Sequence, residues 1–249
     1  METSKKKVTI VTICKNAENL MGQTIKSVLA QTYKDIEYII IDGKSTDGTI
    51  GMINQYGNKI AKFVSEQDLG IYDAMNKGIG LATGEIICFM NAGDKFHSKN
   101  VVEKIVECFE SADVEGIFGD VCLIDSEGKA VAIKRQKFID DSFLMNDSIC
   151  HQSMFVKVKL FNQYGLFNLK YKLAADLEWF LRVIRKFKVN FKHADIVVAD
   201  YILGGFSSDE IRYKKEHQEI ISLYYSFPKI VYLKLISKFN RFSKFYQKI

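Results

Sequence analysis

The feature that most constrains the fold is an alternation of short apolar runs with helix-like stretches through the first third of the chain. Four runs read as strands: 8–13 (VTIVTI), 36–42 (IEYIIID), 62–66 (KFVSE) and 85–90 (EIICFM). Between them, apolar residues recur at helical spacing, as in IYDAMNKGIGLA. Strands that alternate with helices imply βαβ units and a mostly parallel sheet buried on both faces. The sequence therefore predicts an α/β fold whose central sheet is flanked by helices.

The second half of the chain is less regular. Runs at 117–124 and 130–133 flank the turn DSEGK and read as a β-hairpin. Three further elements are expected: a strand-like run at 148–157 and helices at 174–187 and 210–225. Asp176 falls in the first turn of the earlier helix, and Ser or Asp residues of GGFSSD can cap the later one.

Composition limits the class of protein. The chain has 249 residues, of which 47% are hydrophobic, enough for one sizeable globular domain. Its five cysteines are widely spaced and form no CxxC pair, so the sequence indicates neither a disulfide framework nor a zinc site. No secretory signal and no run of about 18 apolar residues are found. We therefore expect a cytoplasmic protein.

The C-terminal segment has a composition of its own. Residues 229–249, just after the single proline Pro228, hold six Lys or Arg and no acidic residue, whereas the whole chain has a net charge of +5. Aromatic and aliphatic residues alternate with these bases, which predicts a basic amphipathic helix on an anionic membrane surface, peripheral to the inner face of the plasma membrane. Packing against the domain or against a second subunit in a homodimer is the alternative. Nucleic acid is not expected as a partner, because no recognition motif accompanies the bases.

Two acidic residues lie where such a sheet binds ligands. Asp42 and Asp94 each come just past the carboxyl end of an apolar strand, and Gly93 allows a sharp turn before the second. The run GIGLATG (78–84) has the wrong glycine spacing for a dinucleotide fingerprint and precedes a strand, and no GxxxxGK[ST] motif occurs. A nucleotide held by carboxylates and a metal remains.

These motifs, in this order and spacing, resemble the inverting family 2 glycosyltransferases of the GT-A fold, in particular those of bacterial polysaccharide and lipopolysaccharide synthesis. The matching pieces lie within about 6–210: residues 8–49, 66–94 (EQDLG to NAGD), HQSMF and AADLEWFLR. The resemblance implies a Rossmann-like nucleotide-diphospho-sugar transferase domain over 1–215, with a nucleotide-binding half at about 6–97 and an acceptor-side half at 98–215. Residues 216–249 would be a helical basic extension.

The activity implied is transfer of a hexose or N-acetylhexosamine, with inversion, from a nucleotide sugar to a glycan or lipid-linked oligosaccharide. A UDP-sugar is the favoured donor. Two alternatives stay open. One is a degenerate, non-catalytic GT-A module that binds sugars or partner proteins. The other is a nucleotidyltransferase, although that class normally begins with a Gly-rich basic loop where this chain has CKNAENL.

The resemblance also assigns residues to the nucleotide. Asp42 would accept a hydrogen bond from the base; its alternative is to cap its own loop in an Asx turn. The remaining nucleotide-side residues are Thr12, Lys15, Asn16, Lys44, Glu66, Asp68, Asn76, Asn91 and Ala92.

The metal motif departs from the family pattern. Asn91 and Gly93 stand where the family's D-x-D has acidic residues, which leaves Asp94 as the expected ligand of Mn²⁺ or Mg²⁺. The alternative for Asp94 is to cap a helix that begins near Ser98.

Asp176 matches the family's catalytic base, which removes the acceptor's proton. Its alternative is a helix N-terminal acid favoured by the helix dipole. Glu178 is a rival base, but two residues along a helix point in different directions. On the acceptor or diphosphate side the resemblance places His151, Gln152, Trp179 and the loop residues Gly205 and Ser207. His151 and Trp179 have core packing as their alternative.

Overall fold

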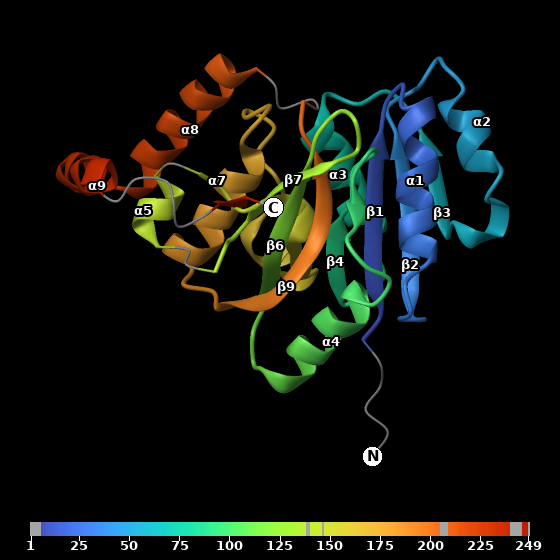
Figure 1. The fold of residues 1–249 in the computed structure, drawn as a ribbon, viewed down its shortest axis with the longest axis horizontal. Helices are drawn as coiled ribbons and strands as arrows, with labels where there is room; N and C mark the ends of the chain where they lie inside the picture. Colours follow the sequence, from blue (N-terminus) through green and yellow to red (C-terminus); the bar gives the residue numbers. More distant parts are fainter. Residues whose placement is uncertain (1–5, 138–139, 146, 205–208, 240–245, 249) are drawn as a thin grey trace.

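The computed structural model describes residues 6–137, 140–145, 147–204, 209–239 and 246–248. Its first half is the expected parallel sheet, in the order β3-β2-β1-β4 (Figure 1). The strands are β1 (Val8–Cys14), β2 (Ile36–Asp42), β3 (Lys62–Ser65) and β4 (Ile86–Phe89). They are connected by the helices α1 (Glu18–Leu29), α2 (Thr49–Asn54) and α3 (Ile71–Leu81), with a 3₁₀ turn at Gly57–Lys59. All four strands therefore end at the same edge of the sheet.

The second half of the sheet is mixed. β8 joins β4 in antiparallel register, and β6 follows, paired antiparallel with β8 and β7 but parallel with β9. β5 and β10 pair antiparallel with β9 and β7, respectively. The bounds are β5 (Lys95–Phe96), β6 (Gly116–Ile124), β7 (Ala130–Lys134), β8 (Met154–Lys157), β9 (Phe191–Ile202) and β10 (Tyr246–Lys248). The parallel pairing expected for the sheet thus dominates only its nucleotide-side half.

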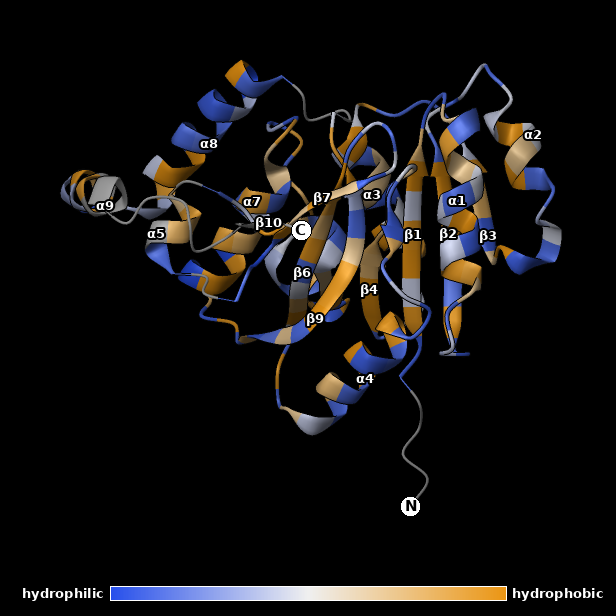
Figure 2. Cartoon of the chain, in the orientation of Figure 1, coloured by the Kyte–Doolittle hydropathy of each residue, from blue (hydrophilic) through white to orange (hydrophobic). Residues whose placement is uncertain are grey.

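Alternate residues of the strands fill two cores, one on each face. Ile10 and Ile40 pack toward α1 and α4 (Val101–Ser111), whereas Val11 and Ile39 pack toward α3 and α7 (Ala175–Leu181). Figure 2 shows apolar colours along β1, β2 and β4. Burial on both faces explains why these strands read as continuous apolar runs.

Helix α7 is shorter than the predicted helix, because its last turns become a π-helix at Arg182–Lys186. Helix α8 (Glu210–Tyr224) is preceded by Asp209, whose side chain accepts the Arg212 N–H as the expected cap. The boundary predicted after residue 215 falls inside α8. There, Glu216 accepts the backbone N–H groups that precede α7, so α8 belongs to the packed domain.

The other short elements are α5 (Asp141–Leu144), the 3₁₀ turn His151–Ser153 and α6 (Lys159–Tyr164).

The helix α9 (Phe227–Phe239) covers only the first part of the segment expected to be a basic helix, because Tyr246–Lys248 form the strand β10. One side packs inward through Leu233, and Lys229 pairs with Asp141 of α5 at 2.6 Å. The opposite side leaves several large apolar side chains exposed: Phe227, Val231, Tyr232 and Leu235. Within the described ranges, no helix is both long and apolar enough to cross a bilayer.

Candidate active site

The turn after β4 places a carboxylate at the edge where the parallel strands end. Gly93 has a φ of +102°, a conformation that side-chain-bearing residues rarely adopt. Thr24 of α1 fixes the turn, because its hydroxyl accepts the Gly93 N–H at 2.9 Å and donates to the Asp94 carbonyl at 2.7 Å. The glycine therefore serves to turn the chain, and α1 holds Asp94 in place.

Asp94 is nearly inaccessible, with 6% of its surface exposed. One carboxylate oxygen accepts from Gln152 Nε2 at 2.8 Å and the other from the Ile202 N–H at 3.3 Å. Burial raises the pKa of Asp94 from 3.8 to about 6. Helix α4 starts only at Val101, after Asn100, so the alternative that Asp94 caps this helix is wrong.

A hydrogen-bonded bridge connects this turn with Asp176. Asn91 Nδ2 lies 2.8 Å from His151 Nε2, and His151 Nδ1 lies 3.1 Å from Asp176 Oδ2. Because an amide N–H₂ only donates, Nε2 accepts in this arrangement and Nδ1 carries the proton that points to Asp176. His151 is thus a polar bridge and not a core residue.

Asp176 is held from its other side by Tyr72 in the first turn of α3. The Tyr72 hydroxyl donates to Asp176 Oδ1 at 2.9 Å, and the Leu177 N–H donates to the same oxygen at 2.8 Å. Burial raises the pKa of Tyr72 well above its ordinary value, so the hydroxyl stays protonated. The rival Glu178 points elsewhere, toward Tyr224 and Arg182, as expected from its place on the helix.

The residues around Asp94 fit a divalent cation. Asn91 Oδ1 is buried and has no hydrogen-bond partner within the described part of the chain, an uncommon state for an amide oxygen. From the described residues each Asp94 oxygen accepts one hydrogen bond, which leaves lone pairs for a ligand. Carboxylate and amide oxygens are the hard donors that Mg²⁺ and Mn²⁺ prefer.

Asp42 holds its own loop. It is fully buried, and its oxygens accept the Ser45 N–H at 2.9 Å, the Ser45 hydroxyl, and the Ser65 hydroxyl at 2.6 Å. The loop-capping alternative is therefore what the structure shows, and Asp42 has no exposed oxygen for a base.

Another carboxylate lies at this edge. A side chain at Gly43 would overlap the carboxylate of half-buried Asp68 and the stem of Lys15. Asn16 (φ +48°) and Lys44 (φ +59°) adopt a backbone conformation that is rare outside glycine. Such residues concentrate at functional sites. Of the residues predicted to face the nucleotide, Lys15 and Asp68 are therefore brought together beside Gly43.

Other predicted residues serve the fold. The Thr12 hydroxyl donates to the Met90 carbonyl at 2.8 Å, inside the sheet. Both ends of the Asn76 amide bond the backbone of Phe167 at 3.0 Å, and exposed Glu66 pairs with Lys77 at 2.9 Å. The side chains of Thr12 and Asn76 therefore do not reach a ligand in this arrangement. The Ala92 N–H donates to the Ile13 carbonyl at 3.1 Å, in the turn before Asp94.

Trp179 is a core residue. It is 0% exposed, stacks on Phe161 with ring centroids 4.5 Å apart, and donates from Nε1 to the Gly165 carbonyl. It cannot stack on a sugar, so the core alternative holds. Gln152 donates to the Asp94 carboxylate at 2.8 Å. Gly205 and Ser207 lie outside the described residues.

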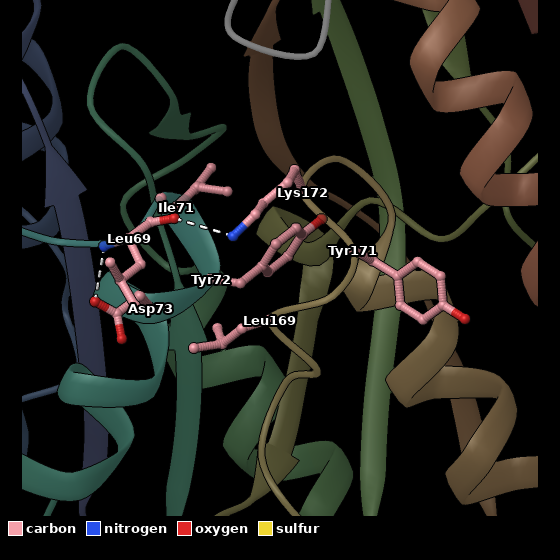
Figure 3. A pocket seen from close by; sticks show the side chains of 8 residues that line it. Leu69, Ile71, Tyr72, Asp73, Leu169, Tyr171 and Lys172 are labelled. Carbon is pink, nitrogen blue, oxygen red and sulfur yellow. Dashed lines mark hydrogen bonds between the residues drawn. The ribbon is translucent and has the colours of Figure 1, made fainter.

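A small pocket lies beside Tyr72, between the start of α3 and the loop 169–172 (Figure 3). Lys172 Nζ closes one side by donating to the Leu69 carbonyl at 3.2 Å, and the Leu69 N–H donates to Asp73. Leu69 is 70% exposed. Sequence reasoning assigned no role to Tyr72, Leu69 or Lys172. For Leu69 and Tyr72 the available signal was the run DLGIYD, which puts both next to a helix start at the ligand edge, whereas no local signal pointed to Lys172.

A half-parallel sheet with the buried carboxylate of Asp94 just past β4, and with Asp176 bridged to the same turn, assigns the chain to one class, the GT-A fold transferases. The model of the family described as Glycosyl transferase family 2 matches residues 9–189, and the chain belongs to that family. It is therefore a glycosyltransferase. This overturns the nucleotidyltransferase alternative.

Relatives agree with this assignment. A PGL/p-HBAD biosynthesis glycosyltransferase of Mycobacterium bovis is 28% identical over 198 residues, which cover 78% of this chain and 76% of the relative. An uncharacterized glycosyltransferase of Mycobacterium tuberculosis is 32% identical over 186 residues, 72% of this chain and 70% of the relative.

Solved structures share the fold. S. aureus TarS 1–349 in complex with UDP-GlcNAc has a TM-score of 0.71 at 16% identity, over 88% of this chain but only 65% of that one. The mannosyltransferase PcManGT from Pyrobaculum calidifontis, in complex with GDP-Man and Mn²⁺, has a TM-score of 0.70 at 17% identity, over 93% of this chain and 70% of that one.

Proposed function

We propose that this glycosyltransferase is metal-dependent and inverting, and that it moves a hexose or N-acetylhexosamine from a nucleoside diphosphate sugar to a glycan acceptor. The observation that carries the proposal is the bridge from Asn91 through His151 to Asp176, which joins the turn that carries Asp94 to the second carboxylate. In this proposal Asp94 serves the donor's diphosphate and Asp176 accepts the proton.

Asp176 acts as the base in this proposal. It takes the proton of an acceptor hydroxyl while that oxygen forms a bond to the anomeric carbon, and the electron pair of the broken bond leaves with the diphosphate. One displacement inverts the anomeric centre. Tyr72 and His151 donate to the two carboxylate oxygens and so orient Asp176. A Mn²⁺ or Mg²⁺ held by Asp94 and Asn91 Oδ1 would neutralise charge on the leaving diphosphate.

The donor is a nucleotide sugar, for which UDP remains the favoured carrier. Support comes from the TarS complexes with UDP-GlcNAc and UDP and from the PcManGT complex with GDP-Man. On this chain, Asp68 beside Gly43 takes the role that the sequence suggested for Asp42. A carboxylate there can accept the imide N–H of uracil or the ring N–H of guanine.

The exposed apolar side of α9 suggests how the enzyme reaches its acceptor. We propose that Phe227 (78% exposed) and Tyr232 (61% exposed) enter the interface of an anionic cytoplasmic membrane surface, where a lipid-linked oligosaccharide would be the acceptor. Removing 229–249, or changing Phe227→Ser together with Tyr232→Ser, should abolish sedimentation with anionic vesicles while donor binding persists. Leu29→Ser, on α1, is the matched control. Unchanged sedimentation refutes membrane docking, and a loss of dimers instead identifies a subunit interface.

The activity is tested by release of nucleoside diphosphate. The purified chain is incubated with Mn²⁺ and UDP-glucose, UDP-GlcNAc or GDP-mannose, with and without a lipid-linked oligosaccharide. We expect release from one carrier class, lost with EDTA and reduced about 10²-fold or more in Asp176→Asn. Glu127→Gln, in an exposed turn, is the control. Equal release by Asp176→Asn would refute its role as base, and absent release with absent nucleotide binding would indicate the degenerate module.

A further inference from the structure

The strands β6 and β9, together with the residue that follows β5, present side chains that could bind a metal. Asp200 on β9 is paired with Cys122 on β6 and with Lys95 on β5. The His97 N–H donates to the Val198 carbonyl at 3.0 Å, so pairing with β9 continues past β5. Side chains two residues apart on a strand share a face. His97 therefore lies on the same face as Lys95, next to Asp200.

The three potential ligands converge. One ligand atom each from His97, Cys122 and Asp200 lies within 4.8 Å of the others. His97 Nδ1 is 2.5 Å from Asp200 Oδ1, while Lys95 Nζ is 3.4 Å from Asp200 Oδ2. Cys122 and Asp200 are buried, but the His97 side chain is 43% exposed. The group is thus buried at Cys122 and Asp200 and open to solvent at His97.

We propose that His97, Cys122 and Asp200 bind a zinc ion. Zn²⁺ binds imidazole nitrogen and carboxylate oxygen at about 2.0–2.2 Å and thiolate at about 2.3 Å, so ligand atoms of a tetrahedral site lie roughly 3.3–3.7 Å apart. The three ligand atoms lie within 4.8 Å of one another, so side-chain shifts on the order of 1 Å bring them to these distances. The thiolate and carboxylate balance the ion's charge, and water at the His97 side completes the four ligands.

Binding changes two protons. The Cys122 S–H bond breaks as sulfur bonds to zinc, and that proton leaves to solvent. The proton on His97 Nδ1, which faces Asp200 without metal, also leaves to solvent, so that the Nδ1 lone pair binds zinc while Nε2 carries the ring's proton. Lys95 keeps its contact with the other Asp200 oxygen as an outer partner. A thiolate ligand favours zinc over Mn²⁺ or Mg²⁺, which separates this site from the oxygen-donor site at Asp94.

The position gives the ion a structural consequence. Lys95 directly follows Asp94, and Ile202, two residues beyond Asp200, donates its N–H to Asp94 Oδ1. Zinc would therefore clamp the two segments that hold Asp94. This role does not depend on the proposed sugar transfer.

The test is zinc binding by the full chain under reducing conditions, in competition with a chromogenic chelator. We expect one zinc per chain, a higher melting temperature with zinc, and thiolate-to-metal charge-transfer absorption when Co²⁺ replaces it. Cys122→Ser and Asp200→Asn should each weaken zinc more than about tenfold. Cys108→Ser, on α4, and Asp94→Asn should leave zinc affinity unchanged.

Two results overturn the proposal. One is the absence of stoichiometric zinc binding by the wild-type chain. The other is zinc binding that persists unchanged in Cys122→Ser, or that is lost in Asp94→Asn. Circular dichroism of each variant without metal identifies any that fail to fold, and Asp200→Asn then provides the independent second variant.

Discussion

Asp94→Asn should stabilise the protein while removing its metal site. The pKa of Asp94 is about 6 in the folded chain, against an ordinary value of 3.8, because burial disfavours the carboxylate. Above pH 6 the charged group therefore lowers the free energy of unfolding by on the order of 3 kcal/mol. The penalty disappears as pH falls through 6 toward 3.8, because the folded state binds the proton first. Asparagine has no such penalty, and Gln152 can reverse its amide to accept from it.

The assay is urea unfolding of both proteins in EDTA at pH 8 and at pH 5, followed by fluorescence of the single, buried Trp179. At pH 8 the variant should be more stable by up to about 3 kcal/mol, and at pH 5 by about half of that. Added Mn²⁺ with UDP should stabilise only the wild type. A variant that is less stable than wild type at pH 8, or a stability difference that does not depend on pH, would refute this reasoning. It would show that the buried, charged Asp94 carboxylate does not lower the stability of the metal-free protein.

Three further substitutions test the geometry. Gly93→Ala should lower the free energy of unfolding, measured in urea, by about 1–2 kcal/mol, because φ at this residue is +102°. Gly51→Ala is the control, because a methyl group at this position of α2 would enter open space. An equal loss of stability in both variants would contradict the argument. Glu216→Ala should lower the free energy of unfolding by about 1–3 kcal/mol in the same assay, because it leaves the N–H groups before α7 without an acceptor. An unchanged urea midpoint would show that water replaces the carboxylate. His151→Ala should reduce turnover about 10-fold or more while the nucleotide affinity stays unchanged, and a loss confined to KM would place His151 in donor binding instead.

Local sequence signals predicted the nucleotide half well. The apolar runs ending at Asp42 and before Asn91 became β2 and β4, and Asp176 lies in the first turn of α7 as expected. These features depend on period, strand ends and caps, which neighbouring residues determine. Local signals left the role of Trp179 open. They show that an aromatic residue lies in the first turns of α7, but not whether its side chain faces the core or a ligand.

Long-range contacts could not be predicted. Tyr72 meets Asp176 across 104 positions, and Ser65 reaches Asp42 only because β3 lies beside β2. The parallel pairing of β6 with β9 gives no periodic signal, so the meeting of Cys122 with Asp200 stayed hidden. When the role of a residue depends on which strands are neighbours, it can be assigned only after the fold is known.

The central claim is that Asp94 holds a divalent ion that binds the donor's diphosphate, and calorimetric titration tests it most directly. UDP and GDP are titrated into wild type and Asp94→Asn, each with Mn²⁺ and with EDTA, at pH 8, where Asp94 is ionised. The account predicts binding of one nucleotide by wild type in Mn²⁺, and a loss of at least about tenfold in affinity on removing either the ion or the carboxylate. Nucleotide binding that is equal in all four conditions would contradict it.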